Sequence, residues 1–560
     1  MFHKVMNPVV ILMIVLLVTV NRSESREIDF GKYENLGHAW YNDHNIVMFD
    51  YTNLTSVIAS GTTAWYVEFF VSWCGHCQRF RPTWTSFAKS VSGWSDIVRV
   101  GALACSNDDN WSICGNYQIE YFPNIRYFSI EDQSLGVQVH SRKETGLMYD
   151  LIRKLENDQR EGKGRDNWPD LSPYSGEDVS SWQAAAPPSV QYQLLVFEEN
   201  NSTLGSEVIL DFHKWKNLQI RRVTEDNFNL TESYNITAYP ALIVLDREDE
   251  PYELELLEPS REGINQVIRD LMQSAGFLPD FETTTTSIEN ASGEVEDSNF
   301  VKKHVEDLVY SADLEAALGY TLRKEIPTTW MIKDDRLEAL EEFLKVISQY
   351  FPLREGNSEF LDELYHAISG RSNIAGTQFS LLVDSYKQKH SPNFMMNRKW
   401  VGCQGSQARY RGFPCGLWTL FHTLTVSHAE AFESEDPESR SAGMVLSAMY
   451  GFIKNFFSCS NCVEHFVEMA NRRNVFNVST VDDSILWLWE AHNEVNQRLS
   501  GDVTEDTAFP KIQYPSQEDC DICRYSDGSW NLQEVLKYLK SKYRYSNIVS
   551  SAVRIERDRQ

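Results

Sequence analysis

Basic residues are scarce in this sequence. Its 560 residues include 52 Lys and Arg against 80 Asp and Glu, which gives a formal net charge of −28 at pH 7. Nucleic-acid-binding proteins and proteins that adsorb to anionic membranes need a basic surface, so the charge argues against both classes. Hydrophobic residues make up 42% of the chain, which is enough for buried cores and excludes wholesale disorder.

Long hydrophobic runs are missing beyond the N-terminus. Lys4, the apolar segment Val9–Val20 and the small residues Ser23–Ser25 have the order of a secretory signal peptide, which we expect to span residues 1–25. An uncleaved membrane anchor is the alternative, although 12 apolar residues are few for a span. No later run reaches the ~18 apolar residues that a bilayer requires, so we expect no transmembrane segment after the leader.

Seven of the N-x-S/T triplets in the sequence are taken as candidate glycosylation sites and point to the same compartment. They lie at Asn53, Asn110, Asn201, Asn229, Asn235, Asn290 and Asn477. One such triplet arises easily by chance, but the set and the leader together predict a glycoprotein of the ER and Golgi lumen that is also secreted. Disulfides persist in that oxidising environment.

Cysteine is sparse as well, with 10 residues and none between Cys114 and Cys403. So few cysteines in so long a chain exclude a small disulfide-stapled scaffold. They form five close pairs, Cys74/Cys77, Cys105/Cys114, Cys403/Cys415, Cys459/Cys462 and Cys520/Cys523. Three pairs have C-x-x-C spacing, which suits redox chemistry, zinc binding or an inert cross-link. An oxidising compartment disfavours zinc thiolates, and we expect no metal.

The first C-x-x-C pair has the sequence context of a reactive dithiol. Ala64–Val71 is a dense aromatic and β-branched run that predicts a buried strand, and Gln78–Lys89 predicts a helix. A motif between strand and helix places Cys74 at the positive end of the helix dipole, which stabilises its thiolate. Cys77, one turn into the helix, is then the shielded resolving thiol. His76 between them can add positive charge and make the disulfide a stronger oxidant.

This segment resembles the thioredoxin fold of protein disulfide isomerases, in which W-C-G-H-C follows V-E-F-F. The resemblance implies that Phe122-Pro123 supplies a cis-proline facing the active site. Glu68 is unusual inside the apolar strand. It is either an edge or solvent-facing carboxylate or a proton acceptor for Cys77, and the sequence leaves both open.

An internal repeat supports the thioredoxin-like interpretation. Tyr117–Ile125 recurs as Tyr234–Leu242, with Tyr, Ile and Pro all displaced by 117 residues. A repeat at domain-sized spacing indicates duplication. The second copy, roughly Val190–Gly276, has no cysteine and is therefore redox-silent.

The C-terminal half has helical periodicity and three motifs with polar or redox-active side chains. The motifs are R-G-F-P-C-G-L-W-x-x-x-H at Arg411–His422, C-x-x-C-x-x-H-F at Cys459–Phe466 and W-x-x-H-N-x-V-N at Trp489–Asn496. Pro414 predicts that the first helix begins after Arg411. Aromatic stripes on helices are usually core, but Trp beside His and Asn needs polar partners, which a planar hydrogen-bonding cofactor provides.

Together these motifs resemble the FAD-binding helical domain of Erv-type sulfhydryl oxidases. Thioredoxin-like copies joined to such a domain resemble the quiescin-sulfhydryl oxidases over nearly the whole chain after the leader. The resemblance implies FAD as cofactor, with Cys462 against its isoalloxazine ring and Cys459 as the entry thiol. The implied FAD contacts are Arg411, Trp418, His422, Asn461, His465, Trp489, His492, Asn493, Val495, Asn496, Lys511 and Tyr514.

The implied function is a flavin-dependent thiol oxidase. Electrons pass from reduced protein thiols to Cys74/Cys77, then to Cys459/Cys462, then to FAD, and finally to dioxygen, which becomes hydrogen peroxide. We expect a monomer and structural disulfides Cys105–Cys114 and Cys403–Cys415. The third C-x-x-C pair, Cys520/Cys523, either shuttles electrons or is a structural disulfide that turnover does not need.

The implied fold class is multidomain α/β plus all-α. Two thioredoxin-like α/β domains precede a helical pseudo-Erv segment and an Erv-type FAD-binding four-helix bundle. The expected boundaries are 1–25 leader, 26–160 redox-active thioredoxin-like domain, 161–185 linker, 186–280 redox-silent thioredoxin-like domain, 281–300 acidic linker, 301–395 pseudo-Erv segment, 396–525 Erv-type domain and 526–560 C-terminal tail. The regions Glu156–Ser181 and Asp280–Asn299 are candidate hinges, because both are polar and rich in turn formers.

Two other function classes fit parts of the sequence. A disulfide isomerase-like enzyme without flavin explains Cys74/Cys77 but leaves Cys459/Cys462 and the Trp489–Asn496 stripe without a role. A non-catalytic secreted binding module is the second class, in which all five cysteine pairs would form structural disulfides. Many vertebrate relatives also join the two thioredoxin copies by a disulfide, for which this chain has no cysteines, and many carry a C-terminal membrane segment, which we do not expect in this form.

Overall fold

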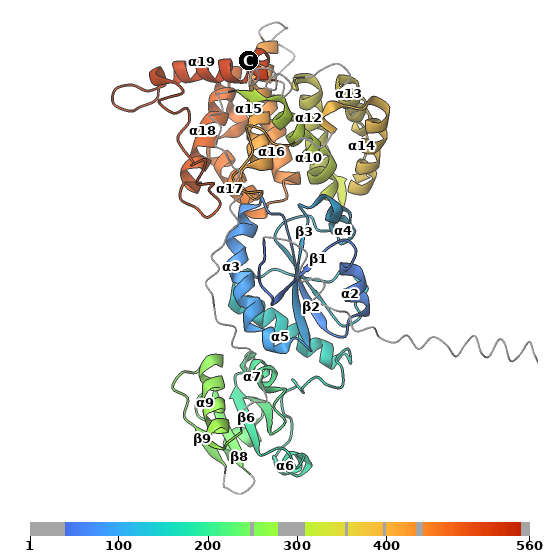
Figure 1. Ribbon diagram of the computed structural model, residues 1–560, viewed down its shortest axis with the longest axis vertical. Helices are drawn as coiled ribbons and strands as arrows, with labels where there is room; N and C mark the ends of the chain where they lie inside the picture. The colour runs from blue at the N-terminus through green and yellow to red at the C-terminus, as the bar shows by residue number, and fades with distance from the viewer. Residues whose placement is uncertain are drawn as a thin grey trace, which may run out of the picture.

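The structure, a computed structural model, describes residues 40–246, 251–277, 308–352, 357–395, 399–432 and 441–549. The predicted leader, the acidic linker 281–300 and Asn290 lie outside the described residues. Figure 1 shows an elongated molecule in which the first α/β domain lies between a second α/β domain and a helical half. The predicted fold class is confirmed, with two thioredoxin-like sheets followed by helices.

The first domain is a five-stranded sheet with strand order β1-β3-β2-β4-β5, in which β4 and β5 run antiparallel to their neighbours. Its strands are β1 (Ile46–Phe49), β2 (Ala64–Phe70), β3 (Val98–Ala104), β4 (Asn124–Phe128) and β5 (Val137–Val139), and its helices are α2 (Leu54–Ser60), α3 (Gly75–Ser90), α4 (Trp111–Asn116) and α5 (Glu144–Arg160). All of β2 is buried and pairs on both edges, which explains its aromatic and β-branched composition.

The second domain repeats this design with a four-stranded sheet in the order β7-β6-β8-β9. Its elements are α6 (Ser180–Ala185), β6 (Tyr192–Glu198), α7 (Leu204–Phe212), β7 (Leu218–Thr224), α8 (Phe228–Ser233), β8 (Ala241–Asp246), β9 (Tyr252–Leu254) and α9 (Arg261–Ser274). The Phe122-Pro123 bond is cis, as the resemblance implied, and so is its repeat counterpart Tyr239-Pro240.

A buried ion pair, which also involves Glu198 of the second domain, and a hydrogen bond join the two α/β domains. Arg222 is 2% exposed, and its Nε lies 2.6 Å from Glu198 Oε1. The same guanidinium also pairs with Glu156 of α5, and Trp94 Nε1 of the first domain donates to Asp211 Oδ1 of α7 at 2.9 Å. A buried ion pair is strongly destabilised when one partner is withdrawn, so separation of these two domains is unfavourable.

The region Glu156–Ser181 does not serve as an open hinge between these domains. Its first residues belong to α5, and Trp168 and Leu171 are buried in the core of the first domain. Tyr174 N–H donates to the Arg222 carbonyl oxygen at 2.8 Å. Its apolar side chains thus anchor an otherwise polar sequence, which argues against the hinge interpretation of this region.

The helical half begins with a short strand and ends with one. Its elements are β10 (Val309–Tyr310), α10 (Ser311–Tyr320), a π-helical turn (Thr321–Glu325), α11 (Ile326–Thr328), β11 (Met331–Lys333), α12 (Asp335–Tyr350), α13 (Asn357–Ile368), β12 (Asn373–Ala375), α14 (Gly376–His390), α15 (Gly412–Phe432), α16 (Met444–Phe456), α17 (Ser460–Arg472), α18 (Val481–Leu499), α19 (Leu532–Tyr543) and β13 (Ile548–Val549). Helix α15 begins directly after Arg411, as Pro414 predicted.

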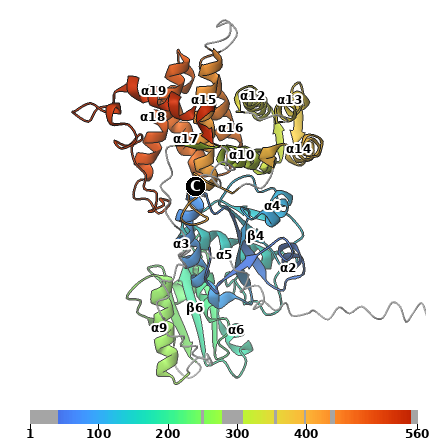
Figure 2. The ribbon, with the colours of Figure 1, turned by 45° about the horizontal axis from the view of Figure 1, so that its top comes forward.

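One hydrophobic core runs through the whole helical half. Phe343 of α12 stacks on Phe452 of α16 with ring centroids 4.8 Å apart, so the pseudo-Erv segment packs on the four-helix bundle as one body. Figure 2 shows α12 and α10 against α15 and α16. Among the helices in the described ranges, none is long and apolar enough to cross a membrane.

The sequons divide by burial. Asn201, Asn229, Asn235 and Asn477 are exposed. Asn53 and Asn110 are buried, and each side-chain oxygen accepts a backbone N–H, from Asp50 at 3.0 Å and from Tyr51 at 2.9 Å. Glycosylation at Asn53 and Asn110 stays a prediction, and the burial of both amides in the folded domain argues against it.

Candidate active site

The Cys74/Cys77 pair of the first domain lies where β2 leads into α3. Cys74 is the N-cap residue of α3 and Cys77 lies in its first turn, and both are free thiols with 0% exposure. Burial raises the pKa of Cys77 well above its usual value, and the nearby Cys74 and Glu68 add to that rise. Cys77 is thus held as a protonated thiol behind Cys74, as expected for the resolving position.

Glu68 lies at the centre of the sheet with 0% exposure, so the edge or solvent-facing interpretation is wrong. Its Oε2 accepts a hydrogen bond from Tyr41 OH at 2.6 Å, and its Oε1 has no partner among the described residues. Burial raises its pKa to about 8, even though the Tyr41 hydrogen bond acts in the opposite direction. A neutral carboxyl at this place can exchange a proton with its surroundings near physiological pH.

Glu68→Gln should stabilise the protein increasingly as pH rises from 4.5 to 8. In that window the unfolded chain releases the Glu68 proton while the folded chain retains it, so wild-type stability falls until the folded pKa is passed. The gain at pH 8 should be about 4 kcal/mol, measured by denaturant unfolding at pH 5 and pH 8. The exposed Glu177→Gln serves as control, and an equal gain at both pH values would contradict the burial of an ionisable carboxyl.

His76 faces the other domain instead of solvent. Its Nδ1 lies 3.1 Å from Ser460 Oγ, next to the second C-x-x-C pair. Burial lowers the pKa of His76, and the positive charges of Arg142 and Arg79 lower it further. The charge expected from the sequence is therefore disfavoured while the two domains are in contact.

The cis-proline loop of the first domain pairs with the chain that carries Cys459. Phe122 N–H donates to the Ser458 carbonyl at 2.8 Å, and Ser460 Oγ donates to the Phe122 carbonyl at 3.1 Å. Cys459 and Phe122 form an isolated parallel β-bridge, and Cys459 is buried in the hydrophobic core of the first domain. The helical half thus presents its cysteine to the thioredoxin-like domain as an extended peptide.

Three sulfur atoms meet at this interface. Cys459 and Cys462 form a disulfide at the start of α17, and the sulfurs of Cys74, Cys459 and Cys462 lie within 4.8 Å of one another. A thiol beside a disulfide at this separation needs only a small movement to exchange. The disulfide also removes the thiolates that zinc would need, so the cluster favours redox chemistry over metal binding.

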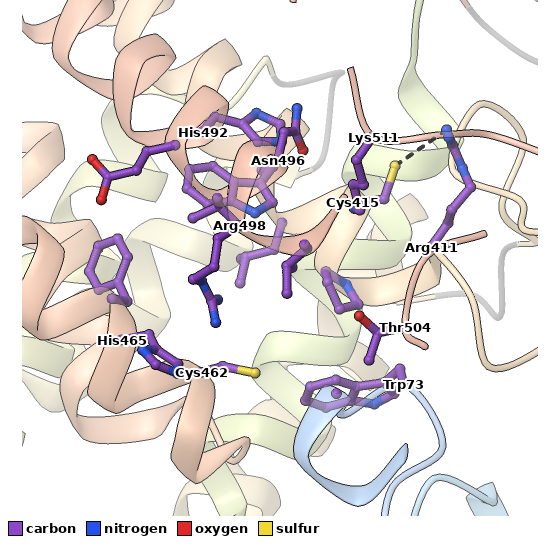
Figure 3. Close-up of a pocket in the computed structure, with 18 of the residues that line it drawn as sticks. Trp73, Arg411, Cys415, Cys462, His465, His492, Asn496, Arg498, Thr504 and Lys511 are labelled. Atoms are coloured by element: carbon purple, nitrogen blue, oxygen red, sulfur yellow. Dashed lines mark hydrogen bonds between the residues drawn. The ribbon is translucent and has the colours of Figure 1, made fainter. Parts of the chain in front are cut away.

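A cavity of about 640 Å³ opens on the far side of this disulfide. Figure 3 shows the Cys462 sulfur directed into it between His465 and Trp73, with Arg411 and Lys511 at the opposite side. Cys459 is not among the residues that line it. The two cysteines of the pair therefore face different neighbours.

Nine of the predicted FAD contacts line this cavity, namely Arg411, Trp418, Asn461, His465, His492, Val495, Asn496, Lys511 and Tyr514. The other three lie directly behind its wall. His422 Nε2 lies 3.2 Å from His492 Nδ1, and Trp489 Nε1 donates to the Tyr514 carbonyl at 2.5 Å. The Asn493 side chain forms two hydrogen bonds with the Tyr514 backbone. Its Nδ2 donates to the Tyr514 carbonyl at 2.7 Å, and its Oδ1 accepts from the Tyr514 N–H at 2.8 Å.

The chemistry of the cavity fits FAD. Trp418 stacks on His492 with ring centroids 4.2 Å apart, a flat wall suited to an aromatic ring system. Burial lowers the pKa values of Arg411 and Lys511, and Arg411 Nε is buried without a hydrogen-bond partner among the described residues. Partly buried cations beside a cavity are complementary to an anionic group such as a pyrophosphate.

Several lining residues were missed by the sequence analysis. Arg498 follows Val495 by three positions on α18, so helical periodicity was a usable signal. Lys542 and Tyr543 belong to α19, in the region expected to be a C-terminal tail, and no motif marked them. Trp73 and Arg79 come from the first domain and line the cavity only because the domains are in contact.

The remaining cysteines form disulfides away from the three-sulfur cluster. They pair as Cys105–Cys114, Cys403–Cys415 and Cys520–Cys523. Cys415 lies at the cavity wall, where Arg411 donates a hydrogen bond to its sulfur at 3.7 Å (Figure 3). The pair Cys520–Cys523 lies in the segment before α19 and is absent from the cavity lining.

Comparisons with known proteins agree with this division of the chain. Four family descriptions match: Thioredoxin at residues 45–153, QSOX Trx-like domain at 166–271, Flavin adenine dinucleotide (FAD)-dependent sulfhydryl oxidase at 306–406 and Erv1 / Alr family at 415–515. Sulfhydryl oxidase 1 of Cavia porcellus is 31% identical over 504 residues, which cover 88% of this chain and 80% of that protein. Sulfhydryl oxidase 2 of Mus musculus is 32% identical over 519 residues, 90% of this chain and 73% of that protein. A solved structure, the Sulfhydryl Oxidase Fragment of Human QSOX1, is 36% identical with a TM-score of 0.40 and covers 44% of this chain and 99% of its own.

Proposed function

The chain belongs to the quiescin-sulfhydryl oxidase family and is an FAD-dependent sulfhydryl oxidase that forms disulfides, and from this premise we propose which residues carry the electrons. In this proposal Cys74/Cys77 takes electrons from substrate thiols, and Cys459/Cys462 passes them to the flavin. The observation that carries it is the position of the Cys459–Cys462 disulfide, between the Cys74 sulfur and the cavity lined by Cys462.

The transfer between the pairs is a thiol–disulfide exchange in two steps. The Cys74 thiolate attacks the Cys459 sulfur, the Cys459–Cys462 bond breaks, and Cys462 leaves as a thiolate at the cavity wall. Cys77 then attacks the Cys74 sulfur, which forms the Cys74–Cys77 disulfide and releases Cys459 as a thiol. The backbone pairing of Phe122 with Ser458 holds the sulfurs in place during this exchange.

Cys74 is fully buried in this arrangement, so a protein substrate cannot reach it. The first domain must separate from the helical half to accept electrons and return to deliver them. The aromatic contact of Trp73 with Phe457, at 5.4 Å between ring centroids, and the bond from Arg79 to Asn461 Oδ1 at 2.7 Å form and break in each cycle. Both are small enough to be reversible.

Bound FAD supplies the two-electron chemistry that joins a thiolate donor to dioxygen, which becomes hydrogen peroxide. The residues of this chain bind and orient it. Arg411 and Lys511 supply positive charge, and Trp418 and His492 provide a flat apolar wall. Three residues behind the cavity wall act as positioning residues, because each contacts a residue of the wall. They are His422, Trp489 and Asn493.

We expect Lys511→Ala to weaken FAD binding at least about tenfold, since a charge-assisted contact to an anion contributes about 1.5–3 kcal/mol. Reconstitution of the apoprotein with FAD, followed by flavin fluorescence, measures the Kd. The matched control is Lys345→Ala on α12 of the same helical half, whose side chain is exposed and absent from the cavity wall. Equal Kd values for both variants would remove Lys511 from the cofactor site.

The double variant Cys77→Ser/Cys462→Ser tests the exchange geometry, because it leaves one thiol on each side of the interface. With oxidised glutathione as electron acceptor, it should accumulate a Cys74–Cys459 disulfide, detected by mass spectrometry of unreduced peptides. The partner variant Cys77→Ser/Cys459→Ser should give a lower yield, since Cys462 faces the cavity. A higher yield in the partner variant would reverse the order proposed for the two cysteines.

The substrates in this proposal are reduced cysteines of proteins in the secretory pathway. The sequence supports that location through its leader and exposed sequons, and an oxidase that forms disulfides is useful where disulfides persist. We also propose a monomer, because the pseudo-Erv segment covers the bundle face formed by α15 and α16.

A further inference from the structure

The pseudo-Erv segment has no evident redox role. It carries no cysteine, and among its described residues none lines the cavity. It nevertheless contacts the first thioredoxin-like domain. Figures 1 and 2 both place α4 of that domain against the side of the helical half that holds α10 and α14.

The first contact lies at the π-helical turn Thr321–Glu325 and the residue before it. Tyr320 OH accepts a hydrogen bond from Trp73 Nε1 at 2.9 Å, directly beside the reactive dithiol. Lys324 forms an ion pair with Asp108, and its Nζ lies 5.5 Å from the centre of the Trp111 ring. A cation between a carboxylate and an aromatic face is a specific and charge-dependent contact.

The second contact lies about Glu120, two residues before the cis-proline loop. Its Oε1 accepts the backbone N–H of Trp330 at 2.8 Å, and its Oε2 lies 3.3 Å from Arg336. Glu120 and Arg336 are both about one-third exposed. Salt screens such a pair readily, so it can form and separate during turnover.

The third contact holds the peptide that carries the disulfide. Glu325 is fully buried, and its two oxygens accept the backbone N–H of Ser458 at 2.9 Å and the Ser458 hydroxyl at 3.1 Å. Ser458 in turn accepts from Phe122 of the first domain. The stretch Tyr320–Arg336 of the pseudo-Erv segment thus positions the peptide that carries Cys459 and also contacts the first thioredoxin-like domain.

We propose that this stretch is a docking platform that recognises the redox-active thioredoxin domain by charge. The platform comprises Tyr320, Lys324, Glu325, Trp330 and Arg336, and it binds the acidic pair Asp108 and Glu120. This inference rests on the proposed electron relay. Opposite charges on the two surfaces raise the rate of productive encounter and fix the orientation in which the sulfurs meet.

The internal repeat supports selection of the first copy over the second. With the 117-residue displacement, Glu120 corresponds to Thr237, which has no charge, whereas Asp108 corresponds to the acidic Glu225. Trp111 corresponds to Phe228, which is 75% exposed. The second copy thus lacks one of the two charges and leaves uncovered the aromatic position that the platform covers in the first.

Charge reversal at one pair tests the platform without altering any cysteine. The readout is the rate of anaerobic flavin bleaching after mixing with reduced ribonuclease A. Glu120→Arg should slow bleaching about tenfold, and adding Arg336→Glu should restore it to within about threefold of wild type. Asp108→Lys should also slow it, whereas the adjacent exposed control Asp109→Lys should not. Rescue by a charge on the opposite surface is a result that a folding defect cannot produce.

Two outcomes separate failure of the platform from failure of the relay. If Cys74→Ser bleaches as fast as wild type, the relay itself is wrong. If Cys74→Ser is inactive while Glu120→Arg and Asp108→Lys both stay within about twofold of wild type at low salt, the relay stands and the platform is refuted.

Discussion

Cys462→Ser is expected to abolish oxygen consumption with every thiol substrate, by at least about 10⁴-fold, which is typical of removing an essential nucleophile. Cys462 is the member of its pair that lines the cavity, so its loss leaves no thiolate beside the bound flavin. Cys459 cannot replace it, since it faces the first domain within that domain's core. Both protein thiols and dithiothreitol should therefore fail as substrates.

The variant should still bind FAD. About half of the residues of the cavity wall come from α15, α18 and the loop before α19, which the substitution does not touch. A yellow, folded and inactive protein is the expected product, checked by absorption spectroscopy and an oxygen electrode. Residual turnover of Cys462→Ser above about 1% of wild type would contradict a single exit for electrons.

Cys74→Ser is expected to produce a selective loss. Oxidation of a reduced protein should fall at least about 10³-fold, because in the proposed relay Cys74 forms the mixed disulfide with the substrate. Dithiothreitol should retain activity, since it is small enough to reduce the Cys459–Cys462 disulfide directly when the domains separate. The ratio of the activity with reduced protein to the activity with dithiothreitol therefore reports on the relay and not on a general loss of folding.

A control for Cys74→Ser is Cys520→Ser, which removes the C-x-x-C pair outside the cavity. It should leave both activities within about twofold of wild type if that disulfide is only structural. Equal losses with protein and dithiothreitol in Cys74→Ser would indicate that the first domain is needed for folding instead of electron delivery.

Much of the site was predictable because its signals are local in sequence. The composition of Ala64–Val71 predicts strand β2, and the C-x-x-C motif that follows it places Cys74 at the start of α3. Pro414 predicts that α15 starts close to Gly412. The spacing of residues along the chain was enough to identify the cysteine pairs and the Trp489–Asn496 stripe. These features depend on neighbours within a few residues.

Features that depend on distant contacts were not predictable. The burial of Glu68 depends on where β2 lies in the sheet, which the strand sequence alone does not reveal. Lys542 reaches the cavity through the packing of α19 on the bundle, and no local pattern marks it. The ion pair of Asp108 with Lys324 joins residues 216 positions apart and exists only when two domains meet.

The central claim is that electrons travel from Cys74/Cys77 through Cys459/Cys462 to FAD. The most direct test is the visible absorption spectrum of the purified protein, followed by anaerobic mixing with reduced ribonuclease A and then with oxygen. We expect a flavin band that bleaches in wild type, persists in Cys74→Ser, and returns in wild type with hydrogen peroxide as oxygen enters. A folded but colourless protein that makes no peroxide, or a band that bleaches equally in both proteins, would contradict it.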